Sequence, residues 1–112
     1  MAQNKKLEFE KPEITIADFA KALSHPARIA ILKEIAKCEE CICGQIVEVL
    51  PLAQSTVSQH LKELLQAGVI CGSVEGTTSC YCINWKVFEK FEKTFANFFH
   101  KTKSFEAKRN CC

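Results

Sequence analysis

The pattern of residues 54–65 constrains the fold of this chain more than any other feature. Its apolar side chains recur at the spacing of one helical face, at Val57, Leu61, Leu64 and Leu65, and Gly68 stands where such a helix would end. The opposite face is polar in its first two turns and consists of Gln54, Ser55, Thr56, Ser58, Gln59, His60 and Lys62. Short or planar polar groups can reach base edges and phosphates in a DNA groove, whereas an ordinary solvated face is usually richer in lysine and glutamate. The pattern therefore favours a DNA-reading helix over a polar cap followed by a plain solvated face.

The segments around this helix predict a helix-turn-helix followed by a two-stranded wing. A short helix from residue 44 or 45 to residue 50 stops at Pro51, and residues 51–53 supply the turn into the next helix, which Ala53, Gln54 and Ser55 cap. Beyond Gly68, residues 69–74 and 79–83 have the composition of strands, and residues 75–78 join them as a hairpin turn. The predicted fold class is mainly α with a β-hairpin wing.

Two more helices are predicted before the turn. The first begins near Thr15, and its apolar residues at helical spacing are Ile16, Phe19, Ala20 and Leu23. The second has Ser24 as its N-cap and Pro26 in its first turn, and it continues to about Lys37. Its apolar stripe consists of Ile29, Leu32, Ile35 and Ala36.

A long last helix, starting near Trp85, is predicted from an aromatic stripe. The stripe consists of Phe88, Phe91, Phe95, Phe98 and Phe99, which share one helical face. An apolar face of this length would be unfavourable to expose on a monomer, so it favours a second copy of the chain as partner. The alternative is that these rings belong to the core of the same chain.

A chain of 112 residues has room for one domain, which we expect over residues 14–105, between a mobile arm (1–13) and a flexible tail (106–112). The first residues lack an apolar signal region and no apolar run is long enough for a membrane helix, so a cytoplasmic location is expected. Without an export signal, the 8 cysteines are expected to remain free thiols rather than to form a disulfide framework. The sequence shows neither a phosphate-binding glycine loop nor a Ser-His-Asp arrangement, which argues against an enzyme.

The charge is unevenly distributed along the chain. Residues 1–37 carry a net charge of +2, residues 38–85 carry −4 and residues 86–112 carry +4. The predicted reading helix lies in the acidic middle, so it would bind DNA through polar groups rather than through a basic stripe. Salt dependence would arise mainly from Lys62 and the two ends of the chain.

Three segments closely resemble the ArsR/SmtB family of winged-helix metalloregulators: residues 22–32 (ALSHPARIAIL), residues 55–64 (STVSQHLKEL) and residues 67–70 (AGVI). The similarity extends over about residues 15–100. It implies a homodimeric repressor that joins through its first and last helices, binds double-stranded operator DNA, and loses DNA affinity when an effector binds. The wing tip lacks the lysine or arginine that the family often places there, so wing contacts to phosphate are expected to be weak or made by threonine hydroxyls.

Cys38, Cys41 and Cys43 form the candidate effector site, at the entry to the helix-turn-helix. In an extended segment residues i and i+2 face the same side, so Cys41 and Cys43 can converge, and Cys38 lies one short turn earlier. Three thiolates without a nearby histidine suit As(III) or Sb(III) better than four-coordinate zinc, although Cd²⁺, Pb²⁺ and Zn²⁺ are alternatives. The segment from Glu40 to Cys43 also resembles the family's arsenic- and cadmium-sensing cysteine box, but residue 46 is isoleucine where some arsenic repressors have a third cysteine. No organic cofactor is expected.

The remaining cysteines and histidines carry weaker signals. Cys111 and Cys112 could chelate a soft ion or lie in a tail without a fixed role, and Cys71, Cys80 and Cys82 are expected to be buried free thiols that act as small apolar residues. Only His100 is present where the family's zinc site needs several histidines. Within the same fold, the alternatives to an arsenic response are a redox- or persulfide-sensing repressor and a Cd-, Pb- or Zn-responsive one; a small zinc-structured interaction protein is a further possibility.

Overall fold

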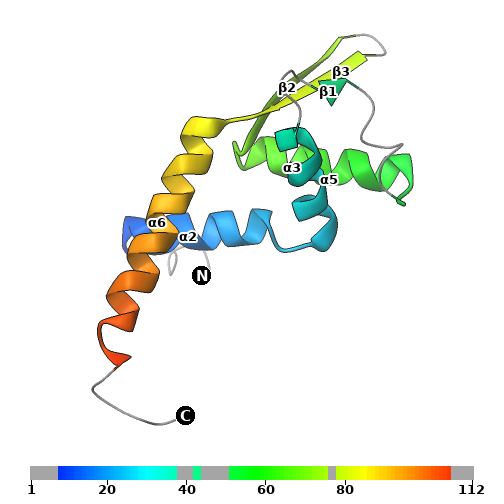
Figure 1. The fold of residues 1–112 in the computed structure, drawn as a ribbon. Helices are drawn as coiled ribbons and strands as arrows, with labels where there is room; N and C mark the ends of the chain where they lie inside the picture. The colour runs from blue at the N-terminus through cyan, green and yellow to red at the C-terminus, as the bar shows by residue number, and fades with distance from the viewer. Residues whose placement is uncertain (1–7, 38–41, 44–50, 76–77, 107–112) are drawn as a thin grey trace.

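The computed structural model describes residues 8–37, 42–43, 51–75 and 78–106. In chain order the elements are α2 (Lys11–Ala22), α3 (Pro26–Lys37), β1 (Ile42–Cys43), α5 (Gln54–Gln66), β2 (Ile70–Glu75), β3 (Thr78–Ile83) and α6 (Trp85–Lys103). α3 and α5 lie together beside a small sheet, and α6 leaves that sheet and crosses α2 (Figure 1). This architecture confirms the predicted fold class. The helix expected over residues 44–50, the wing tip at residues 76–77 and both chain ends lie outside the described residues.

α2 begins at Lys11, which is earlier than predicted and inside the segment expected to be an arm. The Glu13 carboxylate accepts a hydrogen bond from the Glu10 backbone N–H at 2.9 Å, and Pro12 occupies the first turn, where its missing N–H is tolerated. These local signals start the helix before its apolar periodicity becomes visible. Along α2 only Phe19 and Ala22 are buried.

α3 covers the predicted residues, but its N-cap is His25 rather than Ser24. The His25 Nδ1 accepts a hydrogen bond from the Ala27 backbone N–H at 3.0 Å, whereas the Ser24 hydroxyl donates to the Lys21 carbonyl at the end of α2. The stripe is also rotated from the predicted one. Its buried residues are Ala27, Ile31, Leu32 and Ile35, while Ile29 and Ala36 are exposed.

β3 is the central strand of a three-stranded antiparallel sheet with the order β1-β3-β2. β2 and β3 form the predicted hairpin, and β1 pairs with the other side of β3, with Ile42 opposite Tyr81 and Cys43 opposite Cys80. The extended backbone expected near Cys43 is therefore present at Ile42–Cys43. Because side chains alternate along a strand, one face of the sheet packs on the core through Ile70, Tyr81 and Ile83, and the cysteines of β2 and β3 occupy the other face.

The core lies between α3, α5 and the sheet. Its fully buried members are Ile31, Val57, Leu64 and Val69. After α5 the chain turns at Gly68, whose φ of +79° is accessible to glycine without strain, so the predicted helix stop is confirmed. Among the described residues, none of the helices combines the length and the apolar character needed to cross a lipid bilayer.

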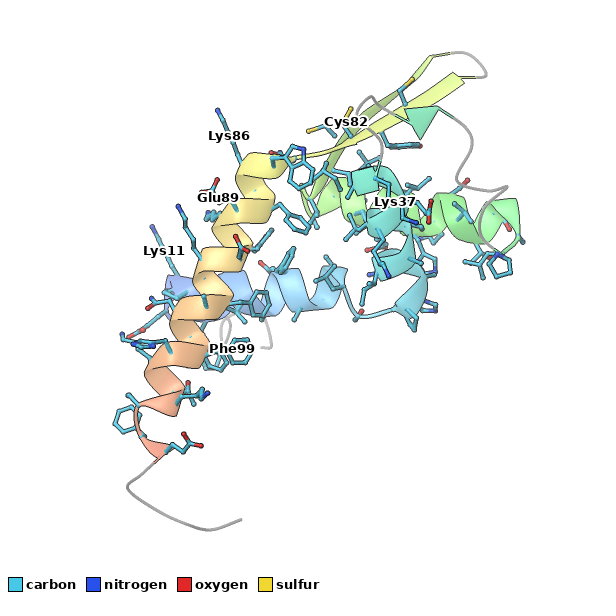
Figure 2. All side chains as sticks on the ribbon, in the orientation of Figure 1. Lys11, Lys37, Cys82, Lys86, Glu89 and Phe99 are labelled. Carbon is cyan, nitrogen blue, oxygen red and sulfur yellow. The ribbon has the colours of Figure 1, made fainter. Side chains whose placement is uncertain are left out.

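The aromatic stripe of α6 divides into two parts. Near the sheet, Phe19 of α2 stacks on Phe91 with ring centroids 3.8 Å apart, and it lies 6.4 Å from Phe88 and 5.3 Å from Phe95. Beyond α2 the helix projects from the body of the protein (Figures 1 and 2), and there Phe98 and Phe99 are 46% and 56% exposed. The predicted stripe is therefore partly intramolecular core and partly open surface.

Candidate nucleic-acid interface

α5 presents the predicted polar surface. Val57, Leu61 and Leu64 are buried, which confirms the inward face, and Leu65 is half-buried. The opposite side chains that the structure describes as exposed are Ser55, Thr56, Ser58, Gln59 and Lys62. The side chain of Gln54 lies outside the described part of the structure. The exposed set combines hydroxyls, one carboxamide and one ammonium group, which can donate to phosphates and pair with base edges.

The first turn of α5 lacks the side-chain cap that was predicted. Its N-cap is Ala53, which has no polar side-chain atom, and the backbone N–H of Val57 bonds to the Ala53 carbonyl at 3.1 Å. The N–H groups of the preceding positions point along the helix axis and, at a helix N-terminus, favour an anion such as a phosphate.

His60 does not belong to the exposed face of α5, so the prediction that it faces outward is wrong. Its side chain is buried, and its Nδ1 accepts a hydrogen bond from Arg28 Nε at 3.1 Å. The His25 ring packs against it with centroids 4.5 Å apart. Sequence contained a signal for this placement, because Val57, His60, Leu61 and Leu64 follow the spacing of one buried helical face.

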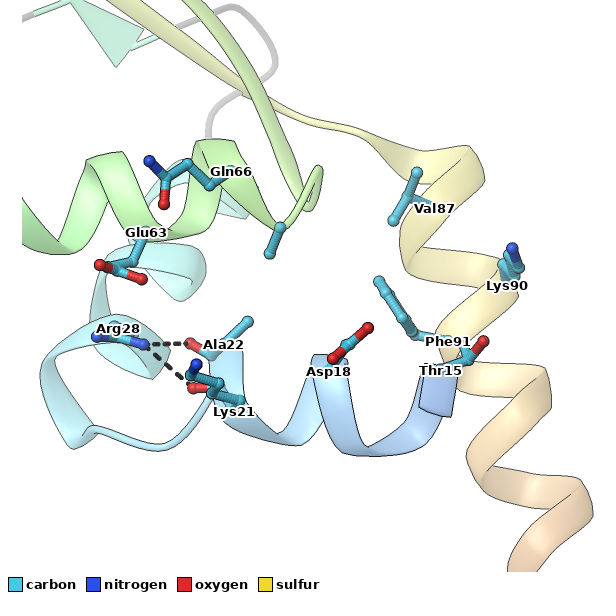
Figure 3. A pocket seen from close by; sticks show the side chains of 11 residues that line it. Thr15, Asp18, Lys21, Ala22, Arg28, Glu63, Gln66, Val87, Lys90 and Phe91 are labelled. Carbon is cyan, nitrogen blue, oxygen red and sulfur yellow. Dashed lines mark hydrogen bonds between the residues drawn. The ribbon is translucent and has the colours of Figure 1, made fainter. Parts of the chain in front are cut away.

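Arg28 joins three elements, and sequence reasoning assigned it no role. Besides its bond to His60 on α5, its Nη1 donates to the carbonyls of Lys21 at 3.1 Å and Ala22 at 3.4 Å, at the end of α2 (Figure 3). The guanidinium can make these bonds together because its donors form a rigid planar fork. Arg28 therefore fixes the orientation of α5 relative to α2.

Burial lowers the pKa of His60 below its ordinary value of 6.5, and the nearby positive charge of His25 and Arg28 lowers it further, against a smaller opposing effect of Glu63. The folded protein thus holds His60 neutral at a pH where the unfolded chain binds a proton. Protonation would also remove the Nδ1 lone pair that accepts the Arg28 bond. We expect the free energy of unfolding to decrease as the pH falls below about 6.5, towards the lower folded pKa.

The measurement is urea unfolding at pH 7.5, 6.5 and 5.5, for the unchanged chain and for His60→Gln, whose amide oxygen can still accept from Arg28. The variant should show a shallower loss of stability between pH 6.5 and 5.5. An identical pH slope in both proteins would contradict this assignment to His60.

A cavity of about 470 Å³ lies beside Arg28, where α2, α3, α5 and α6 meet. Its charged lining includes Asp18, Lys21, Glu63 and Lys90 as well as Arg28 (Figure 3). Because charges of both signs alternate around it, the cavity selects neither an anion nor a cation, and we assign it no ligand.

The structure changes the account of the cysteines. The three wing cysteines were expected to be buried free thiols. Cys71 is free but exposed, so its predicted burial is wrong. Cys80 and Cys82 are half-buried and disulfide-bonded, so the prediction that they are free thiols is wrong. Of the predicted effector ligands, Cys43 lies in β1, while Cys38 and Cys41 fall outside the described residues, as do Cys111 and Cys112. Within the described ranges no group of three or more histidine, cysteine or acidic side chains is arranged to hold a metal ion. The three-thiolate site therefore stays a prediction.

Comparison with known proteins identifies a regulatory domain. Residues 25–70 match the family model described as "Bacterial regulatory protein, arsR family". The chain is 37% identical over 68 residues to the transcriptional repressor PagR of Bacillus anthracis, and this alignment covers 61% of this chain and 68% of PagR. It is 38% identical over 64 residues to the repressor SmtB of Mycobacterium tuberculosis, covering 57% of this chain and 47% of SmtB. The arsenical resistance operon repressor of Bacillus subtilis is 37% identical over 65 residues, covering 57% of this chain and 61% of that protein. The chain thus spans about half the length of SmtB.

Solved structures show the same fold. An ArsR family transcriptional regulator superposes with a TM-score of 0.69 at 17% identity, covering 90% of this chain and 98% of that one. An ArsR-like regulator from Rhodococcus sp. RHA1 gives 0.68 at 20% identity, covering 84% and 88%. These likenesses confirm the winged helix-turn-helix, and all of the named relatives are regulators rather than enzymes, which agrees with the prediction from sequence.

Proposed function

The chain belongs to the ArsR family of bacterial regulatory proteins, and from that premise we propose that it is a transcriptional repressor that binds operator DNA through α5. The observation that carries this proposal is that one face of α5 is buried in the core while the opposite face is polar and exposed. The exposed residues are Ser55, Thr56, Ser58, Gln59 and Lys62. Two such helices, one from each subunit of a dimer, would enter successive major grooves about 34–36 Å apart on a palindromic site.

The proposed dimer joins through α2 and α6. Phe98 and Phe99 continue the aromatic stripe past the point where α2 covers it, and their rings lie 5.3 Å apart on the projecting end of α6. A groove of about 640 Å³ between α2 and α6 borders the same end and includes Ile16 and Phe98 in its lining. A second copy of the chain would cover this apolar surface and complete the pair of reading helices.

We propose As(III) or Sb(III) as the effector, bound by the thiolates of Cys38, Cys41 and Cys43. The support is the chemistry of three soft donors close together in sequence and the likeness to a relative named as an arsenical resistance operon repressor. Cys43 lies in the chain between α3 and α5, so a contraction around the ion would act on the connection that positions α5. A coupling of about 1–3 kcal/mol between effector and DNA would lower operator affinity about 5- to 150-fold.

The test begins with a duplex that the reduced protein selects from a random DNA library, followed by a fluorescence-anisotropy titration with and without arsenite. We expect arsenite to weaken binding at least about fivefold, and we expect Cys41→Ser/Cys43→Ser to bind the duplex normally but to lose the response. The matched control, Cys111→Ser/Cys112→Ser, should respond like the unchanged chain.

The outcomes separate the parts of the proposal. If no duplex is selected, DNA binding itself is wrong. If binding occurs but arsenite and antimonite leave it unchanged, the arsenic response is wrong, and the same titration with Cd²⁺, Pb²⁺ and Zn²⁺ tests the alternatives. A response that persists in Cys41→Ser/Cys43→Ser would place the effector on other residues.

A further inference from the structure

Arg28 and His60 form a polar anchor that holds α5 at the border of its exposed face. The Nδ1 of His60 accepts a hydrogen bond from Arg28 Nε at 3.1 Å, and the same guanidinium donates to two backbone carbonyls at the end of α2. Along α5, His60 directly follows Gln59 and lies one turn after Thr56, and both of these side chains are exposed on the face proposed to read DNA. A shift of α5 at His60 therefore displaces residues proposed to contact the operator.

The hydrogen bonds determine which ring nitrogen of His60 carries the proton. Because Nδ1 accepts from Arg28, the neutral ring holds its proton on Nε2, and a second proton can enter only at Nδ1. That proton would meet the Arg28 N–H, so two donors would face each other without an acceptor between them. The ring of His25, with its centroid 4.5 Å from that of His60, offers no replacement, since its own Nδ1 accepts from the Ala27 backbone N–H. The anchor thus exists only while His60 is neutral.

The charged groups around the anchor come from four helices and have both signs. His25 and Arg28 face His60 from the start of α3, and Glu63 faces it from the next turn of α5. The cavity beside Arg28 adds Asp18 and Lys21 from α2 and Lys90 from α6 (Figure 3). Burial lowers the pKa of His60 below 6.5, the charges of His25 and Arg28 lower it further, and Glu63 opposes them. Protonation therefore takes place below pH 6.5 and requires the loss of the Arg28 bond.

We propose that Arg28 and His60 form a proton-sensitive anchor of α5, which releases the helix when His60 takes up a proton and thereby weakens operator binding. This inference rests on the proposed function, because it concerns the affinity of the same face of α5 for DNA. Operator DNA would bind the form with neutral His60, so affinity is complete above pH 6.5 and declines as the pH falls through the lower folded pKa.

The predicted direction is opposite to the effect of charge alone. Each added proton makes the protein more positive, which by itself would strengthen its attraction to phosphates. A loss of operator affinity at acidic pH therefore indicates a change in how α5 is held. An unrelated duplex, which is bound mainly through phosphates, should not show this loss.

The test is a fluorescence-anisotropy titration at pH 7.5, 6.5 and 5.0 and constant ionic strength, with the duplex selected at pH 7.5 and with an unrelated duplex of the same length. We expect the Kd for the selected duplex to rise at least about fivefold between pH 7.5 and 5.0, with most of the change below pH 6.5. The Kd for the unrelated duplex should stay constant or fall.

Two variants make the same substitution at different histidines. His60→Gln keeps an oxygen that accepts from Arg28 but cannot take up a proton there, so its Kd should change less than about twofold between the two pH values. His100→Gln, at an exposed position of α6, should keep the fivefold change. Circular dichroism at pH 7.5 and 5.0 establishes that each protein is folded in both conditions.

A second measurement is independent of DNA affinity. Long-range nitrogen–proton NMR correlations of the histidine rings should show His60 with its proton on Nε2 at pH 7.5 and on both nitrogens at acidic pH. The midpoint of this change should move to lower pH when the selected duplex is bound, because the coupling between proton and DNA is reciprocal.

Three results would overturn the proposal: equal operator affinity at pH 7.5 and 5.0, an acid response in His60→Gln as steep as in the unchanged chain, or a neutral His60 ring protonated on Nδ1. The failure of DNA binding itself would look different, since no duplex would then be selected at pH 7.5. A duplex that binds without pH dependence contradicts the anchor alone.

Discussion

Replacing Phe19 by alanine is expected to lower the free energy of unfolding by about 3–5 kcal/mol. Phe19 is 6% exposed and contacts Phe88, Phe91 and Phe95, so it is the ring through which α2 holds the first half of α6. Alanine would remove the stacked contact with Phe91 and leave a cavity between α2 and α6. Few other side chains join these two helices, so the cavity would not be filled by repacking. The measurement is urea unfolding of the reduced protein at one fixed protein concentration, because dimerisation would make stability depend on concentration.

Phe9→Ala provides the matched control. Phe9 precedes the same helix and is 57% exposed, so the identical substitution there should change the free energy of unfolding by less than about 1 kcal/mol. If Phe19→Ala is as mild as Phe9→Ala, then the aromatic cluster does not join α2 to α6 in solution.

Phe98→Asp/Phe99→Asp is expected to convert the protein to a monomer at micromolar concentration and to weaken operator binding at least about 100-fold. Both rings are exposed at the end of α6 that projects past α2, and charged groups there would have to lose their water to enter an apolar interface. A monomer offers one reading helix instead of two, so it loses the contacts of one half-site. Sedimentation equilibrium gives the mass, and anisotropy with the selected duplex gives the affinity.

Ala96→Asp/His100→Asp controls for charge. Both residues are exposed and close to the aromatic pair along α6, but neither lines the groove between α2 and α6, and their replacement adds negative charge at this end of the helix without removing a phenylalanine ring. The control should remain dimeric and bind DNA within a fewfold of the unchanged chain. A dimeric Phe98→Asp/Phe99→Asp protein would show that the subunits join elsewhere.

Local patterns in the sequence were sufficient for most of the fold. The spacing of Val57, Leu61 and Leu64 predicted both the helix and its buried face, and Gly68 predicted its end. The two strands and the long last helix followed in the same way from short-range composition. These predictions succeeded because helix and strand periods, turns and stops are set by neighbours a few residues apart in the chain.

Contacts between distant residues decided the rest. The spacing of Val57, Leu61 and Leu64 already places His60 on the buried face, but its partner Arg28 lies 32 positions away and donates to its Nδ1, and no local pattern announces that contact. The aromatic stripe divided where α2 stops covering α6, and only the register of β1 on β3 shows that residue 43 lies opposite residue 80. Periodicity states which residues share a face of their own helix or strand, but only packing and strand register determine what lies against that face.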